Sequence, residues 1–386
     1  MKHPTTVFGN LLSHFPRSEF EKAVFQYGGD KGVRVLDCFN LFKTLVFGQL
    51  TQAFSVREIE SSMAAQSRQL YHCGLKPVKR STLCDALEKR DPVIFERTFE
   101  ALVSTAQRLS RADGRRFRSP LKIIDASTIE LCLAQFDWAK FRTTKGAVKI
   151  HVALNGEGLF PEKVQITPGA VHEVRQLATL TNASDTIYVM DRGYVDFKRL
   201  WDINLSGSIF VTRVKENCQC AMVKMLYVTQ KGPIRLDNLV KLTGQKSTIS
   251  YPENLRQVAY QDPETGKKYI FMTNDFISPA QDIADIYKAR WQVELFFKWV
   301  KQNLKIKTFL GTSQKAVFTQ IWVALIVFML LWISKKVNGL AATKQRIIQL
   351  LKTSLMSKRS ILDLFKTYSP PGITHQYLLC LKGGKN

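Results

Sequence analysis

Acidic side chains are scarce in the last quarter of this 386-residue chain. Residues 286–386 contain two Asp or Glu against seventeen Lys or Arg, a net charge of +15, while residues 1–120 carry +7 and residues 121–285 carry +2. The whole chain has a net charge of +24. Because each neutralised phosphate releases counterions, such a surface favours DNA strongly and in a salt-dependent way. An anionic membrane surface or ribosomal RNA are the alternative partners.

The sequence also lacks a long hydrophobic run and an evident leader. The oily stretch within residues 316–333 is uninterrupted for only 13 residues, from Ile321 to Ile333. A bilayer span needs about 20 residues, so we predict a buried core helix and no membrane partner. The N-terminus has no charged start followed by an apolar run and a small-residue cleavage site, which indicates no signal peptide. We therefore expect a cytoplasmic protein.

Cysteine is neither paired nor clustered. The seven cysteines are scattered, and only Cys218 and Cys220 lie close together, without a second pair or a group of histidines. This spacing predicts neither a disulfide framework nor a zinc site. We expect reduced, mostly buried thiols. No internal repeat or low-complexity segment is present either.

The first 115 residues have the periodicity of helices. Apolar residues three and four apart predict helices over residues 7–15, 19–27, 34–52 and 55–71. Thr82 to Asp85 resembles a capping box that opens a further helix. Lys76, Lys79 and Arg80 come just before it, where phosphates could meet both the cations and the helix N-terminus. A helix-turn-helix reader and a helical bundle with a basic loop both remain open.

From Leu121 the pattern changes to strands. Expected strands alternate with loops, and helices are expected over residues 171–181 and 195–205. The expected strands cover residues 121–127, 129–134, 147–153, 159–167, 186–190 and 208–214, followed by short β-rich pieces at 226–229, 256–260 and 269–273. This order predicts an α/β fold, a mixed sheet flanked by helices.

Two of the expected strands end in an aspartate. Lys122-Ile-Ile-Asp125 and Ile187-Tyr-Val-Met-Asp191 each deliver an acid to the C-terminal end of a β-branched run. Singly, an acid at a strand end means little. Together with a third carboxylate from a helix, the two aspartates would suit Mg²⁺, which takes hard oxygen ligands and shares its shell with substrate phosphates. A pair of such ions can hold both oxygens of an in-line phosphoryl displacement.

The third carboxylate lies in a helical stretch. At about 100° per residue, five side chains fall within an arc of roughly 80°. They are Tyr287, Arg290, Glu294, Lys298 and Lys301. A neighbouring arc holds the apolar set Ile286, Ala289, Val293, Phe297, Val300 and Leu304, typical of a core-facing helix. The plain alternative is a solvated face with ordinary ion pairs.

These residues carry a resemblance to a known family. Asp125, Asp191 and Glu294 resemble the DDE triad of bacterial insertion-sequence transposases. Tyr287-x2-Arg290-x3-Glu294-x6-Lys301 is similar, at every spacing, to the Tyr-Arg-Glu-Lys signature of the insertion-sequence-four family. The phrases at residues 191–194 and 210–215 are similar to that family's second-aspartate region. The first hundred residues resemble an uncharacterised N-terminal domain found in many members, so the likeness covers nearly the whole chain.

The resemblance implies a ribonuclease-H-like core with Asp125 on the first strand and Asp191 on the fourth. It implies a helical DNA-binding domain over residues 1–115 and a catalytic domain over residues 116–386. A β-rich insertion is expected at about 216–275 and a basic helical part at about 305–386. The implied cofactor is Mg²⁺, as two ions, for which Mn²⁺ can substitute. Asp125, Asp191 and Glu294 would ligate the metal.

The implied partners are double-stranded DNA, both terminal inverted repeats and target, and a second copy of the chain when DNA is bound. The location would be the nucleoid. Tyr287, Arg290, Lys298 and Lys301 would grip phosphates near the cleaved end, with Lys79 and Arg80 as further DNA contacts.

One departure concerns tryptophan. Cut-and-paste relatives stack an insertion tryptophan on a flipped base in a hairpin step, but no tryptophan occurs here between Asp202 and Arg290. The aromatic rings that could stack instead are Tyr227, Tyr251, Tyr260 and Tyr269.

Other residues near the expected site also need a role. Glu130 and Asp196 are the substitutes should a triad member be misassigned. His151 is interpreted as a strand histidine and His172 as a capping or loop histidine.

The sequence thus predicts a Mg²⁺-dependent transposase that binds terminal inverted repeats, cuts the ends by phosphodiester hydrolysis and joins the 3′ ends to target DNA. Two alternatives remain. One is a transposase-derived DNA-binding regulator without catalysis, which predicts a damaged triad. The other is a stand-alone metal-dependent nuclease, which uses the same site chemistry.

Overall fold

Two compact units make up the chain in this computed structural model, which describes residues 6–53, 55–111, 114, 116–214, 217–229 and 231–366. The first unit gathers residues 1–102, 303–305 and 319–386, and the second gathers residues 103–302 and 306–318. The expected domain division into 1–115 and 116–386 stays a prediction; the first unit includes residues from both sides of that boundary. Residues 115, 215 and 216 and the tail 367–386 lie outside the described residues.

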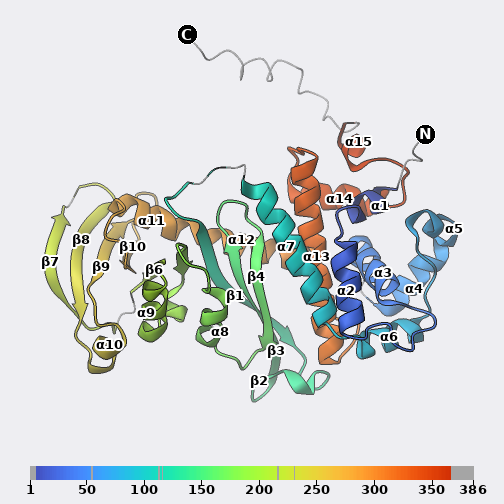
Figure 1. The fold of residues 1–386 in the computed structure, drawn as a ribbon, viewed down its shortest axis with the longest axis horizontal. Helices are drawn as coiled ribbons and strands as arrows, with labels where there is room; N and C mark the ends of the chain where they lie inside the picture. The colour runs from blue at the N-terminus through green and yellow to red at the C-terminus, as the bar shows by residue number, and fades with distance from the viewer. Residues whose placement is uncertain are drawn as a thin grey trace, which may run out of the picture. The chain divides into compact units, whose positions relative to one another are not determined.

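The first unit is helical, as the periodicity predicts. Blue N-terminal and red C-terminal helices belong to it together (Figure 1), and α14 packs against α1 and α3. Its helices are α1 (Val7–Leu12), α2 (Arg17–Gln26), α3 (Cys38–Thr51), α4 (Val56–Ala65), α5 (Ser67–Leu70), η1 (Tyr71–Cys73), α6 (Arg80–Lys89), α14 (Lys344–Ser354) and α15 (Ile361–Lys366). The residues of two longer helices, α7 (Val93–Ser110) and α13 (Gln314–Val337), are divided between the two units.

Two helix boundaries differ from the sequence expectations. The stretch 55–71 divides at Gln66 into α4 and α5. The predicted capping box is wrong, because α6 already begins at Arg80, whose backbone N–H donates to Glu60 Oε1 at 3.1 Å. A carboxylate from α4 thus supplies the oxygen expected from Thr82. The connection from α4 to α6 contains α5 and η1, so it is longer than the short turn of a helix-turn-helix.

The oily stretch forms a core helix, as predicted. Within α13 every residue from Ile321 to Ile333 is buried. The helix is long and apolar enough to cross a membrane, but 94% of its most apolar window is buried inside the protein. An all-round apolar helix is what a protein core also requires, and burial decides between the two uses.

The second unit is built on a ten-stranded sheet. The order is β2-β3-β1-β5-β6-β10-β9-β8-β7, with β4 also pairing with β3. The strands are β1 (Leu121–Leu131), β2 (Lys140–Arg142), β3 (Lys145–Asn155), β4 (Pro161–Pro168), β5 (Ile187–Met190), β6 (Ile209–Arg213), β7 (Cys220–Val228), β8 (Ile234–Leu242), β9 (Leu255–Gln261) and β10 (Lys268–Thr273). The helical elements are η3 (Asp137–Ala139), α8 (Glu173–Leu180), η4 (Arg192–Tyr194), α9 (Phe197–Leu205), α10 (Gln245–Ser250), α11 (Ala280–Ala289) and α12 (Trp291–Asn303).

The core of this sheet is ribonuclease-H-like. Strands β4, β3 and β1 pair antiparallel, and β1, β5 and β6 continue in parallel. This confirms the expected α/β class. Asp191 follows the fourth long strand, as expected, once the three-residue β2 is set aside. The two expected strands 121–127 and 129–134 are one continuous strand, β1.

The β-rich insertion extends the same sheet. Strands β7 to β10 pair antiparallel, and β10 pairs with β6. The expected pieces at 226–229, 256–260 and 269–273 lie within β7, β9 and β10. Strand β8 was not expected, because Asp237 and Asn238 interrupt its apolar pattern. Arg256 explains how Asp237 is tolerated: it pairs with the Asp237 carboxylate at 2.7 Å in a buried position.

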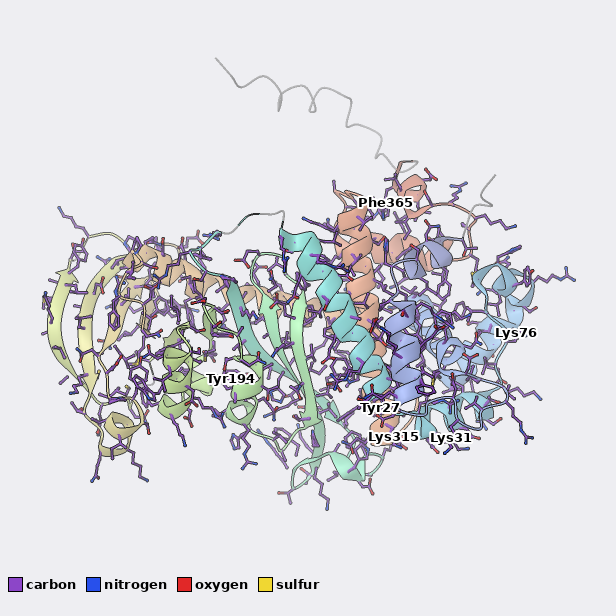
Figure 2. The ribbon with its side chains drawn as sticks, in the orientation of Figure 1. Tyr27, Lys31, Lys76, Tyr194, Lys315 and Phe365 are labelled. Carbon is purple, nitrogen blue, oxygen red and sulfur yellow. The ribbon has the colours of Figure 1, made fainter. Side chains whose placement is uncertain are left out.

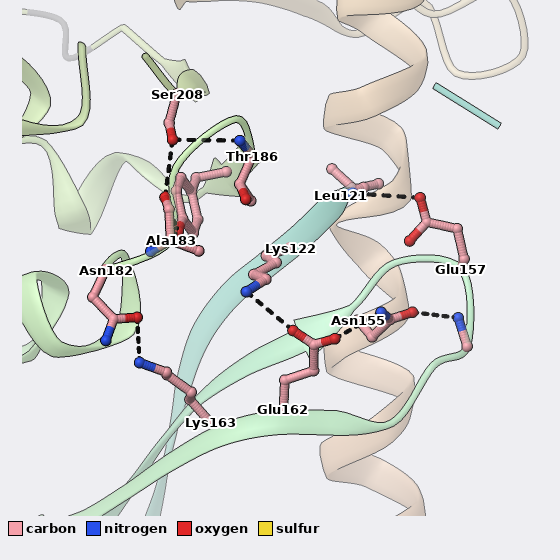
Figure 3. A network of polar contacts seen from close by, with 12 residues as sticks. Leu121, Lys122, Asn155, Glu157, Glu162, Lys163, Asn182, Ala183, Thr186 and Ser208 are labelled. Carbon is pink, nitrogen blue, oxygen red and sulfur yellow. Dashed lines mark hydrogen bonds and ion pairs between the residues drawn. The ribbon is translucent and has the colours of Figure 1, made fainter. Parts of the chain in front are cut away.

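A polar network holds together the strand ends that lead to the two aspartates (Figure 3). Lys122 on β1 pairs with Glu162 on β4 at 3.1 Å, and Asn155 on β3 donates to the same carboxylate at 2.9 Å. Ser208 Oγ accepts the Thr186 backbone N–H at 3.3 Å just before β5. These contacts link β1 and β3 to β4, and the residue before β5 to the residue before β6.

Candidate active site

Strand register places Asp125 and Asp191 next to each other. Ile124 of β1 pairs with Met190 of β5, so the two aspartates directly follow partner residues. The sequence predicts Asp125 at the end of its strand, and this is wrong, because Asp125 lies in the middle of β1. It is nevertheless at the carboxyl end of the parallel pairing, because β1 and β5 pair no further.

The alternation of a strand decides which face the acids occupy. Ile124, Tyr188 and Met190 point into a core cluster that contains residues of α8 and α9. Side chains alternate between faces, so Asp125 and Asp191 point to the opposite face. Figure 1 shows α8 and α9 on one side of the sheet and α11 on the other. The acids therefore face the side from which α11 and α12 approach.

The signature stretch is not one continuous helix, and in this respect the prediction is wrong. Helix α11 ends at Ala289 and α12 begins at Trp291, with Arg290 at the junction. The backbone at Arg290 is itself helical, with φ −53° and ψ −30°. Tyr287, Arg290 and Glu294 therefore still present their side chains together. The apolar arc is confirmed: Ile286, Val293 and Phe297 are all buried.

Arg290 links Glu294 on α12 to Asp125 on β1. Its Nη1 lies 3.3 Å from Asp125 Oδ2, and its Nη2 donates to Glu294 Oε1 at 2.6 Å. The guanidinium side chain is 15% exposed, against 20% for Asp125 and 35% for Glu294. A single cation thus sits between two of the three predicted acids. A planar guanidinium with several donors suits such bridging better than a lysine would.

Tyr287 and Lys301 complete the arrangement. The Tyr287 hydroxyl donates to Asp191 Oδ1 at 3.3 Å. Lys301 Nζ donates to the backbone carbonyl of Thr128 on β1 at 2.9 Å. Both side chains were expected to grip phosphates, but in the protein alone their polar atoms are engaged with the sheet. Sequence reasoning could not find Thr128, because a backbone carbonyl leaves no signal in a sequence.

Burial changes the acidity of this cluster. The pKa of Asp125 rises to about 6, mainly because burial disfavours its charged form. The Ala126 N–H and Arg290 oppose that rise, while Glu294 and Asp191 add to it. Burial, followed by the charges of Asp125, Glu173 and Asp191, also raises the pKa of Tyr194. Among the described residues the buried Tyr194 hydroxyl has no hydrogen-bond partner.

Oxygen donors in this cluster fit a hard divalent cation. Two adjacent carboxylates and a third on α12 are the donor chemistry that Mg²⁺ takes. As the side chains stand, the described residues contain no group of three His, Cys, Asp or Glu arranged to hold a metal ion. The Arg290 guanidinium contacts both Asp125 and Glu294.

An aromatic pocket of about 350 Å³ adjoins Tyr287 and Arg290. Its rings come from Tyr260, Tyr269, Phe271, Tyr287 and Trp291, with Arg213 and Lys288 beside them. Tyr260 and Tyr269, predicted as stacking residues, therefore line the same pocket as Tyr287 and Arg290. The prediction for Tyr251 is wrong, because that ring is 1% exposed and packs edge-on against Trp201. Tyr227 lies on the edge strand β7.

The substitute acids have other roles. Glu130 is exposed and pairs with Lys145 at 3.5 Å, and Asp196 caps α9 by accepting the Arg199 N–H. His151 is a strand histidine: it pairs with Ala126, so it faces away from Asp125. His172 stands at the N-cap of α8 without a side-chain capping bond.

Three further predicted DNA contacts are exposed. They are Lys298 on α12, and Lys79 and Arg80 at the start of α6. Of the six cysteines in the described residues, none forms a disulfide, as predicted. Only Cys38 and Cys73 among them are buried, so the expectation of mostly buried thiols is wrong.

Fold and site together define a ribonuclease-H-like protein with acids at the carboxyl end of its parallel strands. Residues 116–330 match the family described as "Transposase DDE domain", and residues 3–76 match a "Domain of unknown function (DUF4372)". The chain therefore belongs to the DDE transposases of bacterial insertion sequences.

Curated relatives agree with this membership. A putative transposase y4zB of Sinorhizobium fredii is 31% identical over 293 residues, 74% of this chain and 80% of the relative. A probable transposase for insertion sequence element IS5377 of Geobacillus stearothermophilus is 32% identical over 260 residues, 67% of this chain and 68% of the relative. A structure of piggyBac transposase in a synaptic complex with hairpin DNA has a TM-score of 0.46 and 10% identity, covering 96% of this chain and 81% of its own. That likeness is too weak to carry an argument.

Proposed function

We propose that this transposase binds the terminal inverted repeats of an insertion sequence, cuts them by metal-dependent phosphodiester hydrolysis and joins the freed 3′ ends to target DNA. The observation that supports the proposal is that Arg290 contacts Asp125 and Glu294 while Tyr287, one turn before it, contacts Asp191. Three acids from separate elements are the ligands that phosphoryl-transfer chemistry with divalent metal requires.

Each residue then has a definite task. Asp125, Asp191 and Glu294 hold Mg²⁺, proposed as two ions that Mn²⁺ can replace. When bound, the metal activates the attacking group and neutralises charge on the phosphate. Arg290 leaves the acids for a DNA phosphate, where its paired donors match two oxygens. Lys298, exposed one turn beyond Glu294, contacts the backbone as a point charge. Lys79 and Arg80 remain proposed contacts of the helical unit.

Before DNA binds, Tyr287 and Lys301 hold parts of the site in position. The Tyr287 hydroxyl orients the Asp191 carboxylate, and Lys301 ties α12 to β1 through Thr128. Their phosphate contacts, proposed from the sequence, follow when the DNA end displaces these bonds. Tyr260, Tyr269 and Trp291 offer aromatic faces to an unstacked base beside the cleaved end. Trp291 supplies the tryptophan that the insertion itself lacks.

Cleavage and binding separate in a simple test. Single replacement of Asp125, Asp191 or Glu294 by Ala abolishes cleavage of end DNA in Mg²⁺ and leaves DNA binding nearly intact, because the basic residues supply the affinity. Glu130→Ala, which removes an exposed acid from the same strand β1, is the matched control and cuts normally. A triad variant that still cuts at the wild-type rate would show that its residue is misassigned.

The remaining alternatives are distinguished by the products. A regulator without catalysis would leave end DNA uncut, and the presence of all three acids argues against it. A stand-alone nuclease would cut but never join ends to a target plasmid. Pairing two ends requires two copies of the chain, so we propose a homodimer on DNA, acting at the nucleoid in the cytoplasm. Sedimentation of the end complex measures that stoichiometry.

A further inference from the structure

A polar groove in the helical unit is built from both ends of the chain. Its volume is about 480 Å³. One wall comes from the N-terminal segment and the other from the C-terminal segment. The polar side chains are Gln66, Gln69 and His72 on the first wall and Lys352, Thr353 and Lys358 on the second.

Backbone hydrogen bonds hold the C-terminal wall in place. The Val7 N–H donates to the Ser357 carbonyl and the Phe8 N–H to the Leu355 carbonyl, each at 3.0 Å. Met356 Sδ lies 3.2 Å from Cys73 Sγ, which ties the same segment to the turn that carries His72. These contacts come from residues far apart in sequence. The groove is therefore a fixed feature of the folded unit.

The groove is lined by hydrogen-bond donors and, in the part of the chain that the structure describes, contains no carboxylate. Within the described residues, the side chains of Gln66, Gln69, His72, Lys352 and Lys358 make no hydrogen bond or ion pair, and no acid lines the groove. Burial lowers the pKa of Lys352, and burial followed by the charge of Lys352 lowers the pKa of Lys305. A half-buried ammonium beside another cation is destabilised unless an anion pairs with it, so the groove favours an anionic ligand.

Charge in the surrounding segment points to an extended polyanion. Between residues 335 and 366 the sequence has eight Lys or Arg and one Asp. Tyr71, next to His72 on the same turn, is 82% exposed and offers an aromatic face. Amide, imidazole and ammonium donors in a basic groove are the usual contacts to the phosphates and sugars of DNA.

We propose that this groove binds the phosphate backbone of duplex DNA, so that the N-terminal and C-terminal segments form one composite DNA-binding unit. The inference rests on the proposed function, because the DNA bound would be that on which the active site acts. It differs from a site at the start of α6, where Glu60 places a carboxylate on the helix N-terminus. Neither segment alone contains the groove.

The test uses the full-length protein and a labelled DNA duplex of arbitrary sequence, followed by fluorescence anisotropy over a range of KCl concentrations. The variant is Lys352→Gln with Lys358→Gln. Each phosphate contact contributes about 0.9 to the log–log salt slope, so the double variant should lower the slope by about 1.8 and weaken binding roughly 60-fold at about 0.1 M salt.

A matched control removes the same charge elsewhere on the same unit. Lys31→Gln with Arg34→Gln replaces two exposed cations, of which Lys31 is labelled in Figure 2, and should leave slope and affinity nearly unchanged. Gln69→Ala with His72→Ala tests the other wall and should weaken binding without changing the slope as much, because it removes neutral donors. It also serves if the lysine variant fails to fold, which thermal unfolding reveals.

The outcomes separate the two claims. If the wild-type protein binds duplex and both groove variants bind as tightly as the control, the groove assignment is wrong and the proposed transposase function stands. If the wild-type protein binds no duplex at all, both fail. Binding of a single strand but not of the duplex would also overturn the inference.

Discussion

Replacing Arg290 with Ala removes the cation between two of the predicted metal ligands. In the wild-type protein Arg290 contacts Asp125 at 3.3 Å and Glu294 at 2.6 Å, with its side chain only 15% exposed. The variant leaves a largely buried Asp125 facing Glu294 and Asp191 with no counter-charge. We therefore expect the second unit to lose stability in the absence of metal.

The size of the loss follows from the burial of the partners. Removing one member of a buried ion pair costs about 3–5 kcal/mol, because the remaining charge stays buried and unpaired. Asp125 is 20% and Glu294 35% exposed, so water can relieve part of this. Protonation of Asp125, whose pKa is already about 6, relieves more. We expect a loss of about 3 kcal/mol near neutral pH.

Chemical denaturation with and without Mg²⁺ measures this effect. A divalent cation can replace the lost guanidinium, so Mg²⁺ should stabilise Arg290→Ala more than the wild-type protein. Arg116→Ala is the control: Arg116 pairs with Asp285 at the same 3.3 Å, but its side chain is 67% exposed. Exposed pairs contribute about 0–1 kcal/mol.

The reasoning would be refuted by either of two results. One is a metal-free stability of Arg290→Ala within about 0.5 kcal/mol of Arg116→Ala, given that buried pairs should cost several times more. The other is an equal stabilisation of wild type and Arg290→Ala by Mg²⁺, which would mean that the cation does not enter the space that Arg290 leaves.

Further predictions concern the packing and titration of neighbouring residues. Phe297→Ala should lower the free energy of unfolding by about 3–5 kcal/mol, because the ring is 7% exposed; normal folding with loss of DNA binding alone would invert our orientation of α12. Tyr287→Phe should keep the fold, since its ring packs 4.6 Å from Phe271, and should slow cleavage without changing the salt slope, because a phenol carries no charge; cleavage at the wild-type rate would show that the hydroxyl does not orient Asp191. Burial lowers the pKa of His151 from 6.5 to about 4. The unfolded chain therefore takes up a proton first as pH falls from 6.5 to 4, and the protein should lose up to about 3 kcal/mol over that interval. His151→Gln should remove this loss, which urea midpoints across the interval measure, and an unchanged pH profile would exclude His151 as its source.

Prediction from the sequence succeeded where a local pattern carries the information. The helices of residues 7–52, the buried helix after Ile321 and most strands follow from periodicity alone. The acids were found because β-branched runs end in Asp125 and Asp191 and because the spacing around Glu294 is fixed. Strand β8 was missed because Asp237 breaks its pattern, and the partner that makes this acceptable, Arg256, is distant in sequence.

The sequence by itself determined the elements, the basic charge and the identity of the acids, because these depend on residue type and on spacing within a few turns. Only the tertiary structure decided which groups meet. Strand pairing set Asp125 beside Asp191, the helix junction placed Arg290 between Asp125 and Glu294, and backbone bonds from α1 brought the C-terminal lysines to the N-terminal helices. Such contacts join chain segments that are far apart in the sequence, and a local sequence pattern does not indicate which of these segments will meet.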